Sequence, residues 1–159
     1  MAMTFTVTPV RSGPDIDLVR ELFREYAESI RVDLEYQGFS AELAGLPGKY
    51  APPTGELLLA RVNGEIGGCV ALRALDGAML EMKRLYVRPS TRGQGLGKGL
   101  IEAAIATARR LGYAELRLDT LATMASAQAL YRSSGFVEIP AYGDAYLPGT
   151  RFYALSLSR

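Results

Sequence analysis

The chain has 159 residues, of which 48% are hydrophobic, and its 18 basic and 17 acidic residues leave a net charge of +1. This length suits one domain over residues 1–159, and the apolar fraction argues against disorder. The small net charge gives no general attraction to nucleic acid or to an anionic membrane, so neither is expected as a partner. Histidine is absent, which excludes Ser-His-Asp and Cys-His catalysis and most zinc sites, so no metal is expected.

The sequence also carries no targeting or membrane signal. No segment has the length and hydrophobicity of a membrane span, and residues 1–10 lack the apolar core of a signal peptide. We therefore expect a cytoplasmic protein. The single cysteine, Cys69, cannot form an internal disulfide.

The first part of the chain predicts a strand followed by two helices. Residues 5–10 alternate as a strand does, and apolar residues repeat with helical spacing over 18–30, with Ser12 as the expected N-cap. Residues 41–46 predict a short second helix. Eight acidic residues and three arginines lie between residues 15 and 42. This segment is either a solvated helix face or the mouth of a site for a cationic substrate.

The remainder predicts a mixed sheet with helices packed on it. Asn63-Gly64 separates two apolar runs and indicates a hairpin, and Asp76-Gly77 indicates a second antiparallel turn. The expected strands are residues 56–62, 65–75, 78–87, 115–119, 136–139 and 152–157, and the expected helices are 96–111 and 123–134. Asp119-Thr120 is expected to form a turn or to cap the helix of residues 123–134.

A glycine-rich turn connects the strand that ends at residue 87 to the helix of residues 96–111. Glycines at positions 93, 95, 97 and 99 leave the backbone amides of this turn uncovered by side chains. These amides lie at the positive end of a helix, where a phosphate group is bound well. The turn is therefore predicted to bind a phosphate.

The spacing of the glycines distinguishes this turn from two other phosphate-binding motifs, the P-loop and the dinucleotide-binding turn. The P-loop pattern requires a glycine where this chain has Arg92, and Ser or Thr where it has Gly99. The dinucleotide pattern requires its third glycine where the chain has Lys98 or Leu100. Asp119 follows at a distance that suits a ribose-binding acid, so a nucleotide-dependent enzyme stays open as an alternative.

Two motifs resemble the GNAT superfamily (GCN5-related) of acyl-CoA N-acetyltransferases. The first is Leu85-Tyr86-Val87 followed by Arg92-x-x-Gly95-x-Gly97, and the second is Ala127-x-x-Leu130-Tyr131-x-x-x-Gly135-Phe136. The resemblance implies an α/β (α+β) fold with a mixed, mostly antiparallel sheet of about seven strands and helices on both faces. One difference is Met124, where many members have Asn.

The same resemblance implies that acetyl-CoA is the cosubstrate. The strand that ends at Val87 would splay from the strand of residues 115–119, and the Val87 amide would bind the thioester carbonyl. The pyrophosphate would bind the amides of the glycine turn. The implied coenzyme A site comprises Leu85, Tyr86, Val87, Arg92, Gly93, Gln94, Gly95, Leu96, Gly97 and Lys98.

Two residues are candidates for proton transfer. Tyr131 would protonate the coenzyme A thiolate, as in the family, or would be a core tyrosine. Glu81 would take the proton of the acceptor ammonium, because some histone-modifying members have their catalytic glutamate at the matching position. Strand parity would place Glu81 on the same face as Val87. The alternative is an ion pair of Glu81 with Lys83 or Arg84.

We therefore predict an enzyme that moves an acetyl group from acetyl-CoA to a primary amine of a small molecule or peptide, by direct attack in a ternary complex. Candidate acceptor contacts lie in the loops around residues 37–42 and 142–146, and they are Gln37, Phe39, Tyr142 and Tyr146. The acid-rich segment suggests a polyamine, an amino sugar or a peptide amine. A non-catalytic acyl-CoA-binding module is the alternative. Dimers are common in the family, so a homodimer is a further expectation.

Overall fold

The computed structural model describes residues 4–143 and 146–157. Their strands are β1 (Phe5–Pro9), β2 (Glu56–Val62), β3 (Glu65–Ala74), β4 (Met79–Val87), β5 (Glu115–Thr120), β6 (Val137–Ile139) and β7 (Arg151–Ser156). The α-helices are α1 (Pro14–Ile30), α2 (Phe39–Ala44), α3 (Leu96–Arg110) and α4 (Ala125–Ser133). Short 3-10 helices are η1 (Leu34–Gln37), η2 (Gly48–Tyr50) and η3 (Pro89–Thr91).

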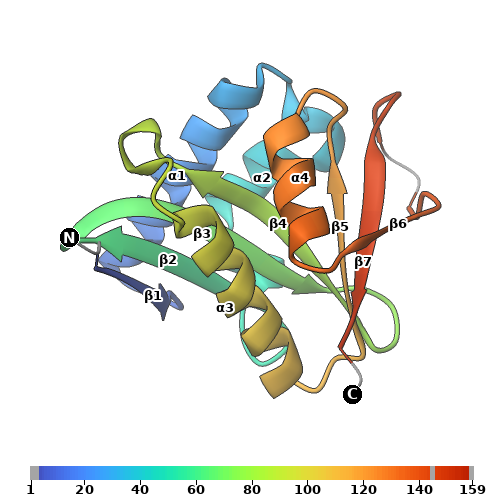
Figure 1. Cartoon of the computed structure of the whole chain (residues 1–159). Helices are drawn as coiled ribbons and strands as arrows, with labels where there is room; N and C mark the ends of the chain where they lie inside the picture. The colour runs from blue at the N-terminus through green and yellow to red at the C-terminus, as the bar shows by residue number, and fades with distance from the viewer. Residues whose placement is uncertain (1–3, 144–145, 158–159) are drawn as a thin grey trace.

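The strands form one seven-stranded sheet in the order β1-β2-β3-β4-β5-β7-β6. Neighbouring strands are antiparallel except for β4 and β5. Helices α3 and α4 cover one face of the sheet, and α1 and α2 cover the other (Figure 1). Each face carries its own buried apolar cluster. The predicted mixed, mostly antiparallel sheet with helices on both faces is confirmed.

The parallel pair of β4 and β5 is much shorter than either strand. Only Met79–Glu81 pairs with Glu115–Arg117, although β4 continues to Val87 and β5 to Thr120. Beyond this point the two strands diverge, as Figure 1 shows. The predicted splay is therefore present, and it leaves one edge of β4 unpaired in the middle of the sheet.

A β-bulge at Arg84 changes the side-chain alternation of β4. The register between β3 and β4 shifts between Cys69 and Ala71, and Arg84 has a φ of 60°. Met82 belongs to the cluster under α3, and Val87, an odd number of residues later, packs against that same cluster. The prediction that Glu81 and Val87 share a strand face is therefore wrong, because the bulge adds a residue between them.

The start of α1 also differs from the prediction. Its N-cap is Gly13, with a φ of 81° and no side-chain cap, so Ser12 does not cap the helix. Pro14 occupies the first turn, where the missing amide hydrogen costs nothing and the fixed φ favours the helix. Proline and glycine thus set this boundary in place of a serine hydroxyl.

A buried ion pair joins α2 to the bulge. Arg84 donates from Nε and Nη2 to the Glu42 carboxylate, both at 2.9 Å, and from Nη1 to Gln37 Oε1 at 2.8 Å. Its guanidinium lies 5.2 Å from the centre of the Phe39 ring. Burial opposes the charge of Arg84, but the Glu42 carboxylate more than offsets this and raises the pKa of the guanidinium.

We predict that Glu42→Gln destabilises the protein by about 3 kcal/mol, because it leaves the buried Arg84 charge without its carboxylate. Thermal unfolding followed by circular dichroism measures the effect. The matched control is Glu138→Gln, which breaks the exposed pair with Arg151 and should cost less than about 1 kcal/mol. Equal decreases in melting temperature in the two variants would contradict the prediction.

Candidate functional site

The glycine turn presents free amides at the start of α3. Gly95 is the N-cap, with a φ of 81° that favours glycine and no side-chain cap. Gly99 N donates to Gly95 O at 3.0 Å, so the amides of residues 96–98 precede the first intrahelical hydrogen bond. Gly99 is required for packing, because a Cβ there would lie 2.5 Å from the Phe5 ring. The turn thus has the anion-binding form that its sequence predicts.

The backbone of Val87 faces the gap between β4 and β5. Arg88 N donates to Gly67 O on β3 at 2.8 Å, and antiparallel alternation turns the preceding residue toward the opposite edge. The Val87 carbonyl accepts a hydrogen bond from Arg92 Nε on this open side at 3.1 Å. The Val87 amide therefore points to where β5 has moved away, as its predicted role requires.

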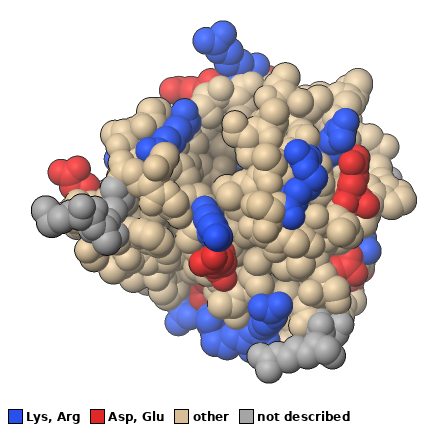
Figure 2. Space-filling view, viewed as in Figure 1, with Lys and Arg blue, Asp and Glu red and all other residues tan. Residues whose placement is uncertain are grey.

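Two cavities adjoin the unpaired edge of β4. The first, here called the inter-strand cavity, lies between β4 and β5 and is bounded by side chains that include Tyr26, Met124 and Tyr131. The second, here called the wide cavity, has a volume of about 630 Å³ and is bounded by α2, η2 and the ends of β3 and β4. Both are lined by Tyr36, Gln37, Lys83, Arg84 and Asp119. The two cavities therefore meet. Figure 2 shows the surface hollowed in its upper middle, where β4 and β5 part, with basic side chains around the hollow.

The inter-strand cavity has unsatisfied polar groups on its walls. Thr120 Oγ1 and Thr150 Oγ1 are buried and have no hydrogen-bond partner among the described residues. Buried hydroxyls are normally paired, and an orphaned one indicates a water or ligand partner. Both hydroxyls therefore have unused hydrogen-bonding capacity beside this cavity, whose volume is about 30 Å³.

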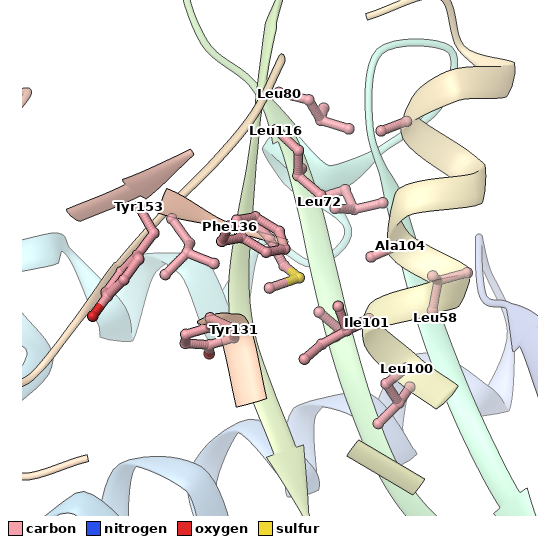
Figure 3. Close-up of a cluster of buried hydrophobic side chains, with 14 of the residues drawn as sticks. Leu58, Leu72, Leu80, Leu100, Ile101, Ala104, Leu116, Tyr131, Phe136 and Tyr153 are labelled. Carbon is pink, nitrogen blue, oxygen red and sulfur yellow. The ribbon is translucent and has the colours of Figure 1, made fainter. Parts of the chain in front are cut away.

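Tyr131 lies in the core with its hydroxyl at the inter-strand cavity. The residue is 5% exposed, and its ring packs edge-on against Phe136 at 6.0 Å and near Tyr153 at 6.2 Å. Figure 3 shows the hydroxyl directed away from Phe136. Burial raises the pKa of Tyr131, and the nearby Tyr26 and Asp119 add to this. The hydroxyl forms no hydrogen bond within the described part of the chain, so a proton donor is present at this wall.

Glu81 lines the wide cavity and is already paired. It is 3% exposed, and it accepts hydrogen bonds from Arg73 Nε and from the Tyr142 hydroxyl, both at 2.9 Å. Lys83 Nζ lies 3.8 Å from the same carboxylate. Burial, followed by the charge of Glu81, raises the pKa of Tyr142. Each Glu81 oxygen accepts one hydrogen bond, so lone pairs remain on the carboxylate that could take up a proton.

Asp119 lies at the junction of the two cavities. The expectation that it caps the following helix is wrong, because the N-cap of α4 is Met124 and no side chain caps it. The Asp119 carboxylate forms no hydrogen bond among the described residues, and its nearest cation is Lys83 Nζ at 3.8 Å. Sequence reasoning missed this placement, because the predicted splay of β4 from β5 does not indicate which side chains of β5 line the gap.

The predicted acceptor contacts separate into two groups. Gln37 and Tyr142 line the wide cavity. Phe39 is 9% exposed and packs in the core against Arg84, and Tyr146 is exposed and stacks edge-on against Phe152 at 5.2 Å. Residues 144–145, within the predicted acceptor loop, lie outside the described residues.

The acid-rich segment does not form the mouth of either cavity. Of the acidic residues between 15 and 42, Glu42 is the one that lines these cavities, and Arg84 neutralises it. Glu25 pairs with Arg88 at 2.8 Å, and Asp15 pairs with Arg61 at 3.2 Å. The solvated-face alternative therefore describes most of this segment.

No helix within the described residues is both long and apolar enough to span a bilayer. Residues 4–143 and 146–157 contain no group of three or more Cys, Asp or Glu side chains placed to hold a metal ion.

Comparisons with known proteins agree with this geometry. A family model described as "Acetyltransferase (GNAT) family" matches residues 16–136. An uncharacterized N-acetyltransferase of Schizosaccharomyces pombe is 38% identical over 97% of this chain and 96% of its own length. A protein named IAA acetyltransferase, from Azospirillum brasilense, is 36% identical over 86% of this chain and 88% of its own.

Solved structures show the same fold. A GNAT-family acetyltransferase of Staphylococcus aureus superposes with a TM-score of 0.77 at 24% identity, covering 96% of this chain and 100% of its own. An acetyltransferase of Salmonella typhimurium, solved with acetyl-CoA, superposes with a TM-score of 0.67 at 22% identity. The match covers 97% of this chain and 94% of the Salmonella chain. The chain belongs to the GNAT acetyltransferase family and is an acetyltransferase.

Proposed function

We propose that the protein transfers the acetyl group of acetyl-CoA to a primary amine, with both substrates bound together and the amine attacking directly. The observation that carries this proposal is the junction of two cavities beside an unpaired strand edge. One cavity is lined by Tyr131 and by β4 as far as Leu85, two residues before Val87, and the other is wide enough for a small molecule. A donor and an acceptor could therefore meet without an acetylated enzyme as an intermediate.

The residues present fit acetyl-CoA. The free amides of residues 96–98 suit its pyrophosphate, and Arg92 and Lys98 add positive charge near them. The unpaired edge of β4 and the orphaned hydroxyls of Thr120 and Thr150 suit its pantetheine amides. The Salmonella acetyltransferase with the same fold was solved with acetyl-CoA, which supports this assignment.

Each proton and bond in the transfer has a candidate group. Acetyl-CoA supplies the acetyl group as a thioester, and the Val87 amide would donate to the carbonyl oxygen where negative charge develops. A carbon–nitrogen bond forms and the carbon–sulfur bond breaks. Tyr131 would donate its proton to the departing sulfur, and the proton that the nitrogen loses as the amide forms would restore the Tyr131 hydroxyl. A carboxylate, Glu81 or Asp119, or a water beside it, would take the proton that the ammonium must lose before attack.

We predict that Tyr131→Phe lowers kcat about a hundredfold, because the departing sulfur loses its proton donor. The KM for acetyl-CoA should stay within about twofold, since the ring packing is kept. Because the pKa of Tyr131 is raised, the hydroxyl stays protonated at neutral pH, and kcat should not fall on its account between pH 7 and about 9. A coenzyme A release assay measures each value.

The matched control for this variant is Tyr113→Phe, whose hydroxyl donates to Thr54 O at 2.8 Å and which lines neither cavity. Unchanged kcat in Tyr131→Phe would remove Tyr131 from the role of acid.

We predict that Glu81→Gln lowers kcat about tenfold or more if Glu81 receives the ammonium proton, with acetyl-CoA affinity unchanged. The glutamine keeps an acceptor for Tyr142 and cannot take up a proton. The pH profile of kcat is measured for the variant and for the unaltered protein. Full turnover with an unaltered pH profile would instead leave Asp119 or water as the acceptor of the proton.

Ligand binding separates the proposal from the alternatives. We expect acetyl-CoA to raise the melting temperature of the protein and NAD and ATP to leave it unchanged, because ligands that bind the folded state stabilise it. Stabilisation by NAD or ATP but not by acetyl-CoA would favour a nucleotide-dependent enzyme. Stabilisation by acetyl-CoA without coenzyme A release from any amine would favour a binding module.

A further inference from the structure

The described walls of the wide cavity carry one more cation than carboxylate. Its described walls carry three carboxylates and four cations, and each carboxylate lies near a cation. The carboxylates are Glu42, Glu81 and Asp119, and the cations are Lys49, Arg73, Lys83 and Arg84. The excess charge of the cavity is therefore positive. A bare cationic acceptor would be repelled by it, which disfavours a polyamine or an aminoglycoside.

The surplus positive charge lies away from the junction. Lys49 lines the wide cavity and not the inter-strand cavity. It is exposed and forms no ion pair within the described part of the chain. Arg73 also lines the wide cavity and not the inter-strand cavity. Its Nε donates a hydrogen bond to Glu81, and its Nη1 and Nη2 have no hydrogen-bond partner among the described residues. Two cationic groups therefore remain available for an anion at this end.

The available negative charge lies at the junction. Asp119 lines both cavities. Among the described residues its ion-pair partner is Lys83, whose Nζ lies 3.8 Å from Asp119 and 3.8 Å from Glu81. Glu42 and Glu81 are each held by an arginine at 2.9 Å and line only the wide cavity. Asp119 is thus the carboxylate free to pair with an ammonium next to the inter-strand cavity.

We propose that the acceptor is a small amine that also carries a carboxylate, as an amino acid does. Its ammonium pairs with Asp119 at the junction, and its carboxylate extends toward Arg73 and Lys49. This inference rests on the proposed function. It follows from the opposite placement of the free negative and free positive groups along one cavity of about 630 Å³.

The direct test compares amines that differ only in the carboxylate. Coenzyme A release is measured with glycine, L-serine, L-glutamate and L-phenylalanine, each beside its α-carboxamide, and with spermidine and kanamycin. The best amino acid should exceed its carboxamide in kcat/KM by about tenfold or more, because an anion is bound through charge-assisted hydrogen bonds. Equal or better use of the carboxamides, spermidine or kanamycin would overturn the inference and leave the proposed transfer intact. Acetyl-CoA binding without release from any amine would overturn both.

A charge reversal tests the cationic end. Lys49→Glu should raise the KM for the best amino acid about tenfold, through repulsion of its carboxylate, and leave the KM for its carboxamide and for acetyl-CoA unchanged. The control is Arg110→Glu, which makes the same change of charge at an exposed residue that lines neither cavity. An equal effect on amino acid and carboxamide, or an equal effect of the control, would overturn the assignment.

The junction is tested with Asp119→Asn, which should raise the KM for the amine about tenfold, because the ammonium loses its carboxylate. A merely structural role would also alter acetyl-CoA binding, so the melting-temperature shift with acetyl-CoA is measured alongside and should be unchanged. An unchanged amine KM would overturn the role of Asp119.

Discussion

The short parallel pairing of β4 with β5 is the constraint on which the rest of the site depends. Three residues of each strand pair, and both strands then continue apart. An unpaired backbone edge inside a sheet is costly unless its amides and carbonyls find partners. The fold meets part of this cost itself, because Arg92 donates to the Val87 carbonyl. The remaining amides are available to a ligand that presents amide and carbonyl groups of its own.

The bulge at Arg84 connects the two halves of the site. It lies where β4 leaves β5, and it turns the guanidinium toward α2, where Glu42 and Gln37 receive it. The left-handed backbone at Arg84 and the buried charge are both unfavourable alone. Their partners are fixed by the same packing, so the distortion that opens the donor edge also fixes the wall of the acceptor cavity.

The sequence predicted the features that depend on neighbours in the chain. Asn63-Gly64 predicted the hairpin and the glycine spacing predicted the anion-binding turn, because local backbone conformation determines both. The bulge was not predictable from strand parity, which assumes regular alternation. The pairing of Glu81 with Lys83 was among the predicted alternatives, whereas the hydrogen bonds of Arg84 to Glu42 and of Tyr142 to Glu81 were missed because these partners lie 42 and 61 positions apart in sequence. Long-range pairing of this kind leaves no periodic signal.

In the proposed function, donor and acceptor would be recognised by different parts of the chain. Backbone amides of one turn and one strand edge form the proposed donor site, so its sequence signature is a compact pattern of small residues. Side chains from η2, β3, β4 and β5 form the acceptor cavity, and its charge balance depends on how they pair. Since two arginines neutralise Glu42 and Glu81, counting acidic residues along the chain gives the wrong sign for this cavity. The proposed preference for an acceptor follows from Asp119, whose one cation is Lys83 at 3.8 Å, and from Lys49, which has no ion pair within the described residues.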